Sequence, residues 1–111
     1  MTPTSPPPKT SSVRRGELRG YTRPSTPDQV RTVVILSSDG INDSPRPWLL
    51  GIELRERDPG DLLAIPVADR GWAYAGDLSR LYRAWVGPPQ GRVDATTLGR
   101  LDGALRAALD L

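Results

Sequence analysis

Runs of apolar residues separated by turn formers organise most of this 111-residue chain. The strongest run spans residues 31–38, Arg-Thr-Val-Val-Ile-Leu-Ser-Ser, which is rich in β-branched side chains and free of helix breakers. Because both alternating faces of this run are apolar, it predicts a central strand that is buried on both sides. Residues 47–54 and 62–67 predict two more strands, and Pro66 places the second of them at a sheet edge. Gly51 in the first permits a bulge or the close approach of another backbone.

The C-terminal segment carries the one convincing helix pattern. Its leucines recur at steps of three and four residues, at Leu98, Leu101, Leu105 and Leu109. Asp94 is a good N-cap for a helix over residues 95–109. Gly99 and Gly103 each weaken this helix by about 1 kcal/mol relative to alanine, and we expect their small size to let the helix lie close to a sheet.

Weaker patterns complete the predicted fold. Residues 72–86 alternate for much of their length, which predicts two short strands with a break near Gly76. Residues 15–22 predict a first strand, and residues 87–91, Gly-Pro-Pro-Gln-Gly, predict a loop. Together these elements predict a mainly β or α+β fold, a small curled antiparallel sheet or barrel with a C-terminal helix.

The N-terminal residues have a different composition from the rest. Residues 1–13 are rich in proline, serine and threonine and show no apolar periodicity. We expect a disordered tail there, because such a segment cannot bury enough apolar surface to offset its ordering entropy. Residues 14–111 then form a single domain, since a chain of this length is too short for two.

The composition of the chain limits the chemistry that it can support. It has no cysteine and no histidine, which excludes disulfides, thiolate metal sites, cysteine nucleophiles and Ser-His-Asp hydrolases. No apolar run approaches the roughly 18–20 residues that span a bilayer, and the first residues lack the apolar segment of a secretory signal. We therefore expect a cytoplasmic protein without a membrane partner.

Charge is unevenly distributed along the sequence. Residues 1–31 carry six basic and two acidic groups, whereas residues 32–111 carry nine basic and eleven acidic groups. Every basic residue except Lys9 is an arginine, and an arginine head can bind phosphate through two hydrogen bonds. A basic N-terminal third on a near-neutral body favours an anionic partner, although a solvated basic tail would have the same composition.

Four segments of the chain are similar to the motifs of one known protein family. Residues 15–17, Arg-Gly-Glu, are similar to the Arg-Gly-acidic start of the family. Residues 31–42, an arginine, an apolar strand and a polar turn ending in asparagine, are similar to its next motif. Residues 71–78, Gly-Trp-Ala-Tyr-Ala-Gly-Asp-Leu, resemble its late strand pair, and residues 91–94 with the helix after them resemble its C-terminal end. On these segments the chain resembles, over residues 14–111, the PemK/MazF toxin family of bacterial type II toxin–antitoxin systems.

This resemblance implies a small SH3-like barrel of the CcdB/PemK type that forms a homodimer. Active members of the family are metal-free endoribonucleases that cut single-stranded RNA at short sequences, and a cognate antitoxin neutralises them. The 2′-hydroxyl of the substrate is the nucleophile in such a reaction, so the protein supplies a charge clamp, a base and an acid. No cofactor is implied, and a chain without histidine and cysteine is compatible with this chemistry.

Three residues are candidates for catalysis. Arg31 matches the catalytic arginine of the family, and its guanidinium could hold a phosphate bidentately or protonate a leaving oxygen. Glu53 falls where the family has a small hydroxyl residue; its carboxylate could act as a base, but it would also repel phosphate. Asp28 resembles the acidic base that some members carry in the loop before the arginine, although this loop is shorter. The plainer interpretations are a surface ion pair for Arg31, a solvent-facing strand residue for Glu53 and a turn residue for Asp28.

A second group of residues are candidates for RNA contacts: Arg19, Arg23, Ser37, Ser38, Asn42, Arg46 and Asp77. The arginines qualify by charge alone. The serines and the asparagine could contact phosphate or order their own turn. Asp77 takes the place of a late glutamine that is structural or reads a base in the family. The tryptophans and tyrosines could stack on bases, but in a chain without phenylalanine we expect them to form the core.

Two other functions stay open on the sequence alone. A catalytically inactive or gyrase-poison-like binding protein on the same fold would account for Glu53, for the short loop before Arg31, and for Thr32, which stands where the family usually has proline. A generic SH3-like adaptor would require an exposed aromatic groove.

Overall fold

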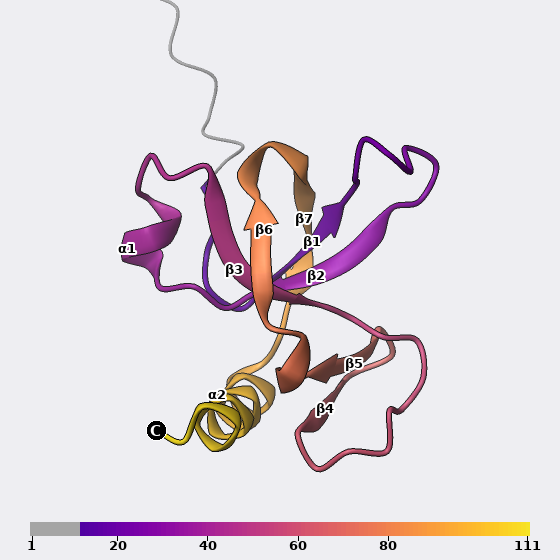
Figure 1. Cartoon of the computed structure of the whole chain (residues 1–111), viewed down its shortest axis with the longest axis vertical. Coiled ribbons are helices and arrows are strands. Elements are labelled where there is room, and N and C mark those ends of the chain that lie inside the picture. Colours follow the sequence, from indigo (N-terminus) through magenta and orange to yellow (C-terminus); the bar gives the residue numbers. More distant parts are fainter. Residues whose placement is uncertain (1–11) are drawn as a thin grey trace, which may run out of the picture.

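The structure is a computed structural model that describes residues 12–111, so residues 1–11 of the predicted tail lie outside the described residues. Val13, the last residue of that predicted tail, is buried in the core. The elements of the described part follow in chain order (Figure 1): β1 (Glu17–Tyr21), β2 (Arg31–Ile35), α1 (Asp39–Asn42), β3 (Trp48–Glu53), β4 (Ala64–Val67), β5 (Gly71–Tyr74), η1 (Ala75–Asp77), β6 (Ser79–Tyr82), η2 (Arg83–Trp85), β7 (Val86–Arg92) and α2 (Ala95–Leu109).

A curled antiparallel sheet of five strands, in the order β6-β3-β2-β1-β7, forms the body of the protein. Strands β4 and β5 pair with each other as a hairpin, and an isolated bridge between Arg55 and Trp72 links β5 to the segment after β3. The predicted mainly β architecture with one C-terminal helix is therefore confirmed. The edge strands β6 and β7 follow each other along the chain through η2, but they are not paired with each other (Figure 1). The sheet therefore curls without closing into a hydrogen-bonded barrel.

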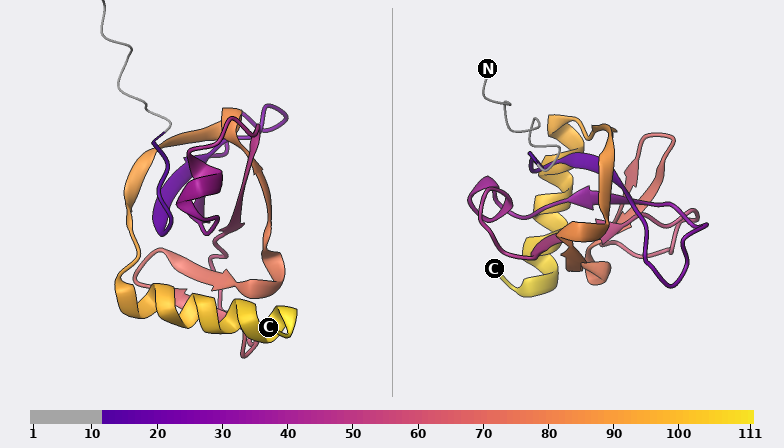
Figure 2. Two further views of the ribbon diagram at one scale, coloured as in Figure 1. Left: turned by 90° about the vertical axis from the view of Figure 1, so that its left-hand side faces the viewer. Right: turned by 90° about the horizontal axis from the view of Figure 1, so that it is seen from above.

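Strand β2 occupies the predicted central position and is buried on both faces. Val33 and Ile35 point to one face and Val34 points to the other, and all three have 0% exposure. One face packs against α2 and the β4–β5 hairpin, which lie together at one end of the curled sheet (Figure 2). The opposite face holds a second cluster made of Val13, Tyr21, Val33, Ile35, Leu49 and Leu81.

The core is aliphatic, which corrects the expectation that the tryptophans fill it. Trp48, Trp72 and Trp85 are half-buried, and Tyr82 is 53% exposed. Tyr21 is the one fully buried aromatic ring of the described residues, and its hydroxyl accepts a hydrogen bond from the Tyr82 main-chain N–H at 2.9 Å. A small, strongly curled sheet brings facing strands close together, so branched aliphatic side chains fill its interior better than indoles do.

Two elements differ from the predicted pattern. Residues 87–91, predicted as a loop, belong to β7, which pairs with β1. Its prolines are tolerated because β7 is an edge strand, where some main-chain groups need not join a ladder, and the pairing shifts register twice along β1. Residues 39–42, which belong to the polar turn expected after β2, form the single helical turn α1, which Ser38 caps by accepting a hydrogen bond from the Ile41 N–H.

Helix α2 has the predicted limits and the predicted N-cap. The Asp94 carboxylate accepts a hydrogen bond from the Thr97 N–H at 2.6 Å. Gly99 and Gly103, expected to lie close to the sheet, instead face open space. The contact with the sheet is made by Leu101 and Ala104. None of the described helices is long and apolar enough to cross a membrane.

Gly51 provides the close backbone approach that the sequence predicted, and its replacement tests the packing of the sheet. A Cβ at this position would lie 2.4 Å from the Val34 carbonyl oxygen and 2.6 Å from Leu81 Cδ1. Because a main-chain oxygen cannot move aside, we expect Gly51→Ala to lower the free energy of unfolding by about 3 kcal/mol. Gly99→Ala is the matched control and should raise it by up to about 1 kcal/mol. Urea denaturation measures both, and equal effects would contradict this packing.

The cap of α2 predicts a pH dependence of stability. The hydrogen bond from the Thr97 N–H holds the pKa of Asp94 below its ordinary value of 3.8. Because the folded-state pKa is depressed, this stabilisation is present above about pH 4 and is lost as the pH falls through the folded value. Asp94→Asn keeps a capping oxygen that does not titrate, so its melting temperature should fall less steeply than that of the wild type below about pH 4. Identical pH profiles would contradict the role of the ionised cap.

Candidate functional site

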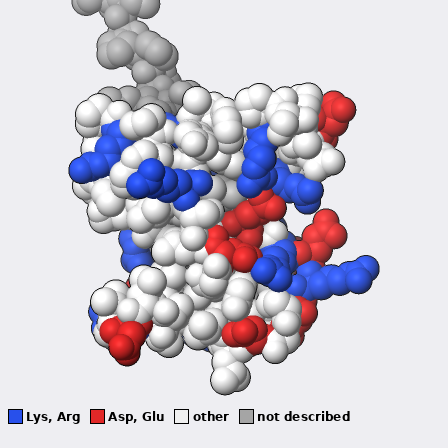
Figure 3. All heavy atoms as spheres, viewed as in Figure 1, with Lys and Arg blue, Asp and Glu red and all other residues white. Residues whose placement is uncertain are grey.

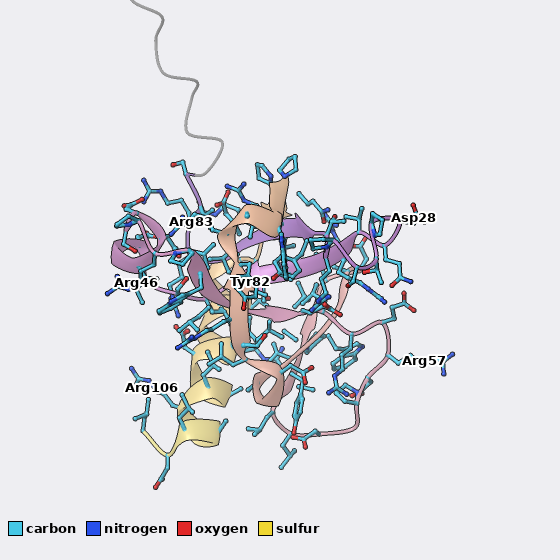
Figure 4. The ribbon with its side chains drawn as sticks, turned by 45° about the horizontal axis from the view of Figure 1, so that its top comes forward. Asp28, Arg46, Arg57, Tyr82, Arg83 and Arg106 are labelled. Atoms are coloured by element: carbon cyan, nitrogen blue, oxygen red, sulfur yellow. The ribbon has the colours of Figure 1, made fainter. Side chains whose placement is uncertain are left out.

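The strand register divides the predicted site residues into two groups at opposite ends of the sheet. Arg31 opens β2, and Glu53 ends the neighbouring antiparallel strand β3. Residues 37–42 follow the other end of β2, and Arg46 precedes β3. Asp28 and Arg46 accordingly lie on opposite sides of the molecule (Figure 4). A single ligand-binding site that includes all the predicted residues is therefore not formed.

An open groove of about 490 Å³ lies at the Arg31 end of the sheet. It is lined by Arg31, Glu53, Leu54, Arg55, Glu56, Arg57, Asp58 and Pro59. Three arginines and three carboxylates leave the lining without net formal charge, and basic and acidic atoms are mixed on the right-hand side of Figure 3. Within the described residues no group of three or more His, Cys, Asp or Glu side chains could hold a metal ion.

Arg31 combines exposure in the groove with a neutral partner. Its Nη2 donates a hydrogen bond to the Gln29 side-chain oxygen at 2.8 Å. None of the ion pairs found between residues 12 and 111 includes Arg31. An amide orients the guanidinium without neutralising it, so the positive charge remains available to an anionic ligand.

Glu53 lies in the groove with Arg31 and is paired to Arg23 in the β1–β2 loop. The Arg23 Nη1 and Glu53 Oε1 atoms are 2.9 Å apart, and both side chains are partly exposed. The Arg23 guanidinium also lies 5.2 Å from the centre of the Tyr21 ring. The structure thus brings together three of the predicted residues, namely Arg23, Arg31 and Glu53. Asp28 is exposed in the same loop and is not among the residues that line the groove.

Asp77 reaches the groove through Arg55, a residue that the sequence patterns did not single out. Arg55 Nε and Nη2 donate to the two Asp77 oxygens at 2.7 and 2.9 Å. These hydrogen bonds raise the pKa of the Arg55 guanidinium above its ordinary value. The alternation of charge in residues 55–58, Arg-Glu-Arg-Asp, directly after a predicted strand was the available signal for a charged groove wall.

At the opposite end of the sheet, the predicted polar residues order their own loop. Ser37 Oγ donates to Asn42 Oδ1 at 2.5 Å, and Asn42 Nδ2 donates to the Ser37 carbonyl at 3.1 Å, with both side chains buried. Arg83, which the sequence did not mark, donates to the carbonyl oxygens of Ile41, Asn42, Ser44 and Arg46. The plainer interpretation of Ser37, Ser38 and Asn42 as turn-ordering residues accounts for these contacts.

The two remaining arginines of the predicted set lie outside the groove. Arg19 is 3% exposed and donates to Glu17, to the Gly87 carbonyl and to the Ser12 carbonyl. This burial corrects its selection as an RNA contact by charge alone, because the guanidinium faces the protein. Arg46 is exposed near the other end of β3, with its guanidinium 5.8 Å from the centre of the Trp48 ring.

Comparison with known proteins gives a consistent result at the level of structure. The sequence matches no family model and no curated protein. An endoribonuclease from Mycobacterial species has a TM-score of 0.75 and 18% identity, with 90% of this chain and 93% of that chain covered. A MazE-MazF structure from Deinococcus radiodurans has a TM-score of 0.78 and 17% identity, with 90% and 98% covered. The Mycobacterium tuberculosis toxin MazF-mt6 has a TM-score of 0.72 and 16% identity, with 86% and 97% covered.

These structures are similar to the chain over nearly its whole described length, while their sequences have diverged widely. The fold predicted from the resemblance is confirmed: the chain has the fold of the MazF toxins.

Proposed function

We propose that this chain is the toxin of a type II toxin–antitoxin system, a metal-independent endoribonuclease that cleaves single-stranded RNA at a specific sequence. The observation that supports this function best is the position of Arg31. Its guanidinium is hydrogen-bonded to an amide and lines the same open groove as the Glu53 carboxylate, and the chain has its fold in common with endoribonucleases. A cation and a carboxylate in one groove can supply the charge clamp and the base that transfer within an RNA chain requires.

In this proposal the 2′-hydroxyl of the nucleotide at the cut attacks its own phosphorus. The Glu53 carboxylate takes the proton of that hydroxyl while the new 2′-O–P bond forms. Arg31 hydrogen-bonds to the non-bridging oxygens, where negative charge develops in the phosphorane. The P–O5′ bond then breaks, and the departing 5′-oxygen takes a proton from water. The products are a 2′,3′-cyclic phosphate and a 5′-hydroxyl.

The distribution of charge in the groove is compatible with recognition of a short segment of RNA. Glu53 already pairs with Arg23, and Asp77 already pairs with Arg55. A neutral lining attracts phosphates weakly at long range, so the affinity depends on specific contacts rather than on bulk charge. Asp28 stands outside this groove and has no step in the mechanism.

The proposed partners follow from the same function. We propose a cognate antitoxin, because some of the similar structures are complexes of MazF with MazE. A homodimer would cover apolar side chains that are exposed in one chain, among them Tyr82, Leu109 and Leu111. The place of action would be the cytoplasm, where single-stranded messenger RNA is available.

Removal of the Arg31 charge is the direct test. In EDTA, the wild type should cut a long single-stranded RNA at discrete positions, and Arg31→Ala should cut at least about 100-fold more slowly, since it lacks the phosphorane clamp. Arg106→Ala removes the same charge from an exposed position on α2 (Figure 4) and should leave the rate unchanged. Primer extension maps the cuts. A folded wild-type protein that makes no cuts would overturn the proposed function.

Glu53→Gln tests the base without changing the size of the side chain. We expect the cleavage rate to fall about 100-fold or more, because the amide cannot accept the 2′-hydroxyl proton. RNA affinity, measured with a non-cleavable 2′-O-methyl strand, should rise or stay constant, since a negative charge has left the groove. Asp28→Asn is the matched control. If that variant loses activity and Glu53→Gln keeps it, the two carboxylates have been assigned wrongly.

A further inference from the structure

Arg55 differs from the other groove arginines because one edge of its guanidinium is held by two hydrogen bonds to a single carboxylate. The two Asp77 carboxylate oxygens accept from its Nε and Nη2 atoms in a fork-like arrangement. Its main chain is also fixed: Arg55 and Trp72 exchange two N–H to carbonyl hydrogen bonds of 2.8 Å each. The position and the plane of this cation are therefore set by the protein before any ligand binds.

The same guanidinium lies over an aromatic ring. The Arg55 Cζ atom lies 5.1 Å from the centre of the Tyr74 ring. Tyr74 is held in turn, because its hydroxyl donates to Asp61 Oδ2 at 3.3 Å. The Arg55 side chain nevertheless keeps 46% exposure and lines the groove. Asp77 holds the edge of the guanidinium and the Tyr74 ring lies on one side of it, so a ligand in the groove can approach the part that stays exposed.

This environment suits a planar ligand better than a phosphate. A phosphate binds an arginine through the parallel N–H groups of the fork, and here Asp77 already occupies such a pair. The flat face of a guanidinium is weakly hydrated and stacks on nucleobases. Leu54 and Pro59 line the same groove and supply apolar surface beside it.

We propose that Arg55 is a stacking platform for one base of the RNA whose phosphate Arg31 binds, a role that rests on the proposed function. Asp77 and Tyr74 are positioning residues that keep the platform flat and in place. The Asp77 side chain, expected from the sequence to contact RNA, would then act through Arg55. A stacking contact contributes to RNA affinity only where the nucleotide carries a base, so Arg55 determines which nucleotides next to the cut contribute to that affinity.

The test uses the full chain and an RNA oligonucleotide that spans a cleavage site mapped with the wild type. A 2′-O-methyl group at the cut prevents cleavage, and an abasic nucleotide is placed at each neighbouring position in turn. We expect one abasic position to weaken wild-type binding about tenfold or more. Arg55→Lys keeps the charge but loses the plane, so it should bind the intact and the abasic strand equally well.

Two further variants separate stacking from charge and from folding. Tyr74→Leu removes the ring below the guanidinium and should reduce the abasic penalty, and it serves as the second test if Arg55→Lys unfolds. Arg57→Lys changes another groove arginine, one that no described ion pair includes, and should keep the full penalty. An Arg55→Lys protein with the wild-type penalty at every position would overturn the platform while leaving the nuclease intact. A wild type that neither cuts nor binds RNA would overturn the proposed function itself.

Discussion

Burial of β2 on both faces is the constraint on which the rest of the structure depends. A strand with Val33, Val34 and Ile35 fully enclosed cannot carry polar chemistry along its length. Polar side chains are therefore confined to its two ends, at Arg31 and at residues 37–42. The antiparallel register with β3 then decides which residues meet at each end: it pairs Glu53 with Val33, two residues from Arg31, and both Arg31 and Glu53 line the groove.

The sequence predicted the elements that carry a strong apolar period and the fold class that they build. The leucine-spaced helix α2 has its predicted limits, and the aliphatic run of β2 and the strand β3 around Gly51 end within three residues of theirs. Strand β7 was missed because its stability comes from pairing with β1, and its prolines and glycines have no strand preference of their own. Burial of Trp48 and Trp72 was overestimated because the residue type alone does not show how much space lies between the facing strands of a curled sheet.

The candidate site was predicted in part, and the reason lies in the partners of the arginines. Fourteen arginines look alike in the sequence, but their surroundings give them different roles. Arg83 binds main-chain carbonyls, Arg19 is enclosed, Arg23 and Arg55 face carboxylates, and Arg31 faces an amide. These partners lie up to 68 residues away along the chain, so no local pattern can distinguish a structural arginine from one that is available to a ligand.

The two faces of the sheet hold separate apolar clusters, and this separation affects how the protein fluctuates. Helix α2 is anchored by Leu101 and Ala104 to the cluster on one face, whereas Tyr21, Val33 and Leu49 belong to the cluster on the other. Transient detachment of α2 therefore exposes the first cluster while the second still holds β1, β2 and β3 together. Amide hydrogens of the helix would exchange with solvent through such partial opening, and those of β2 would exchange only when the whole domain unfolds.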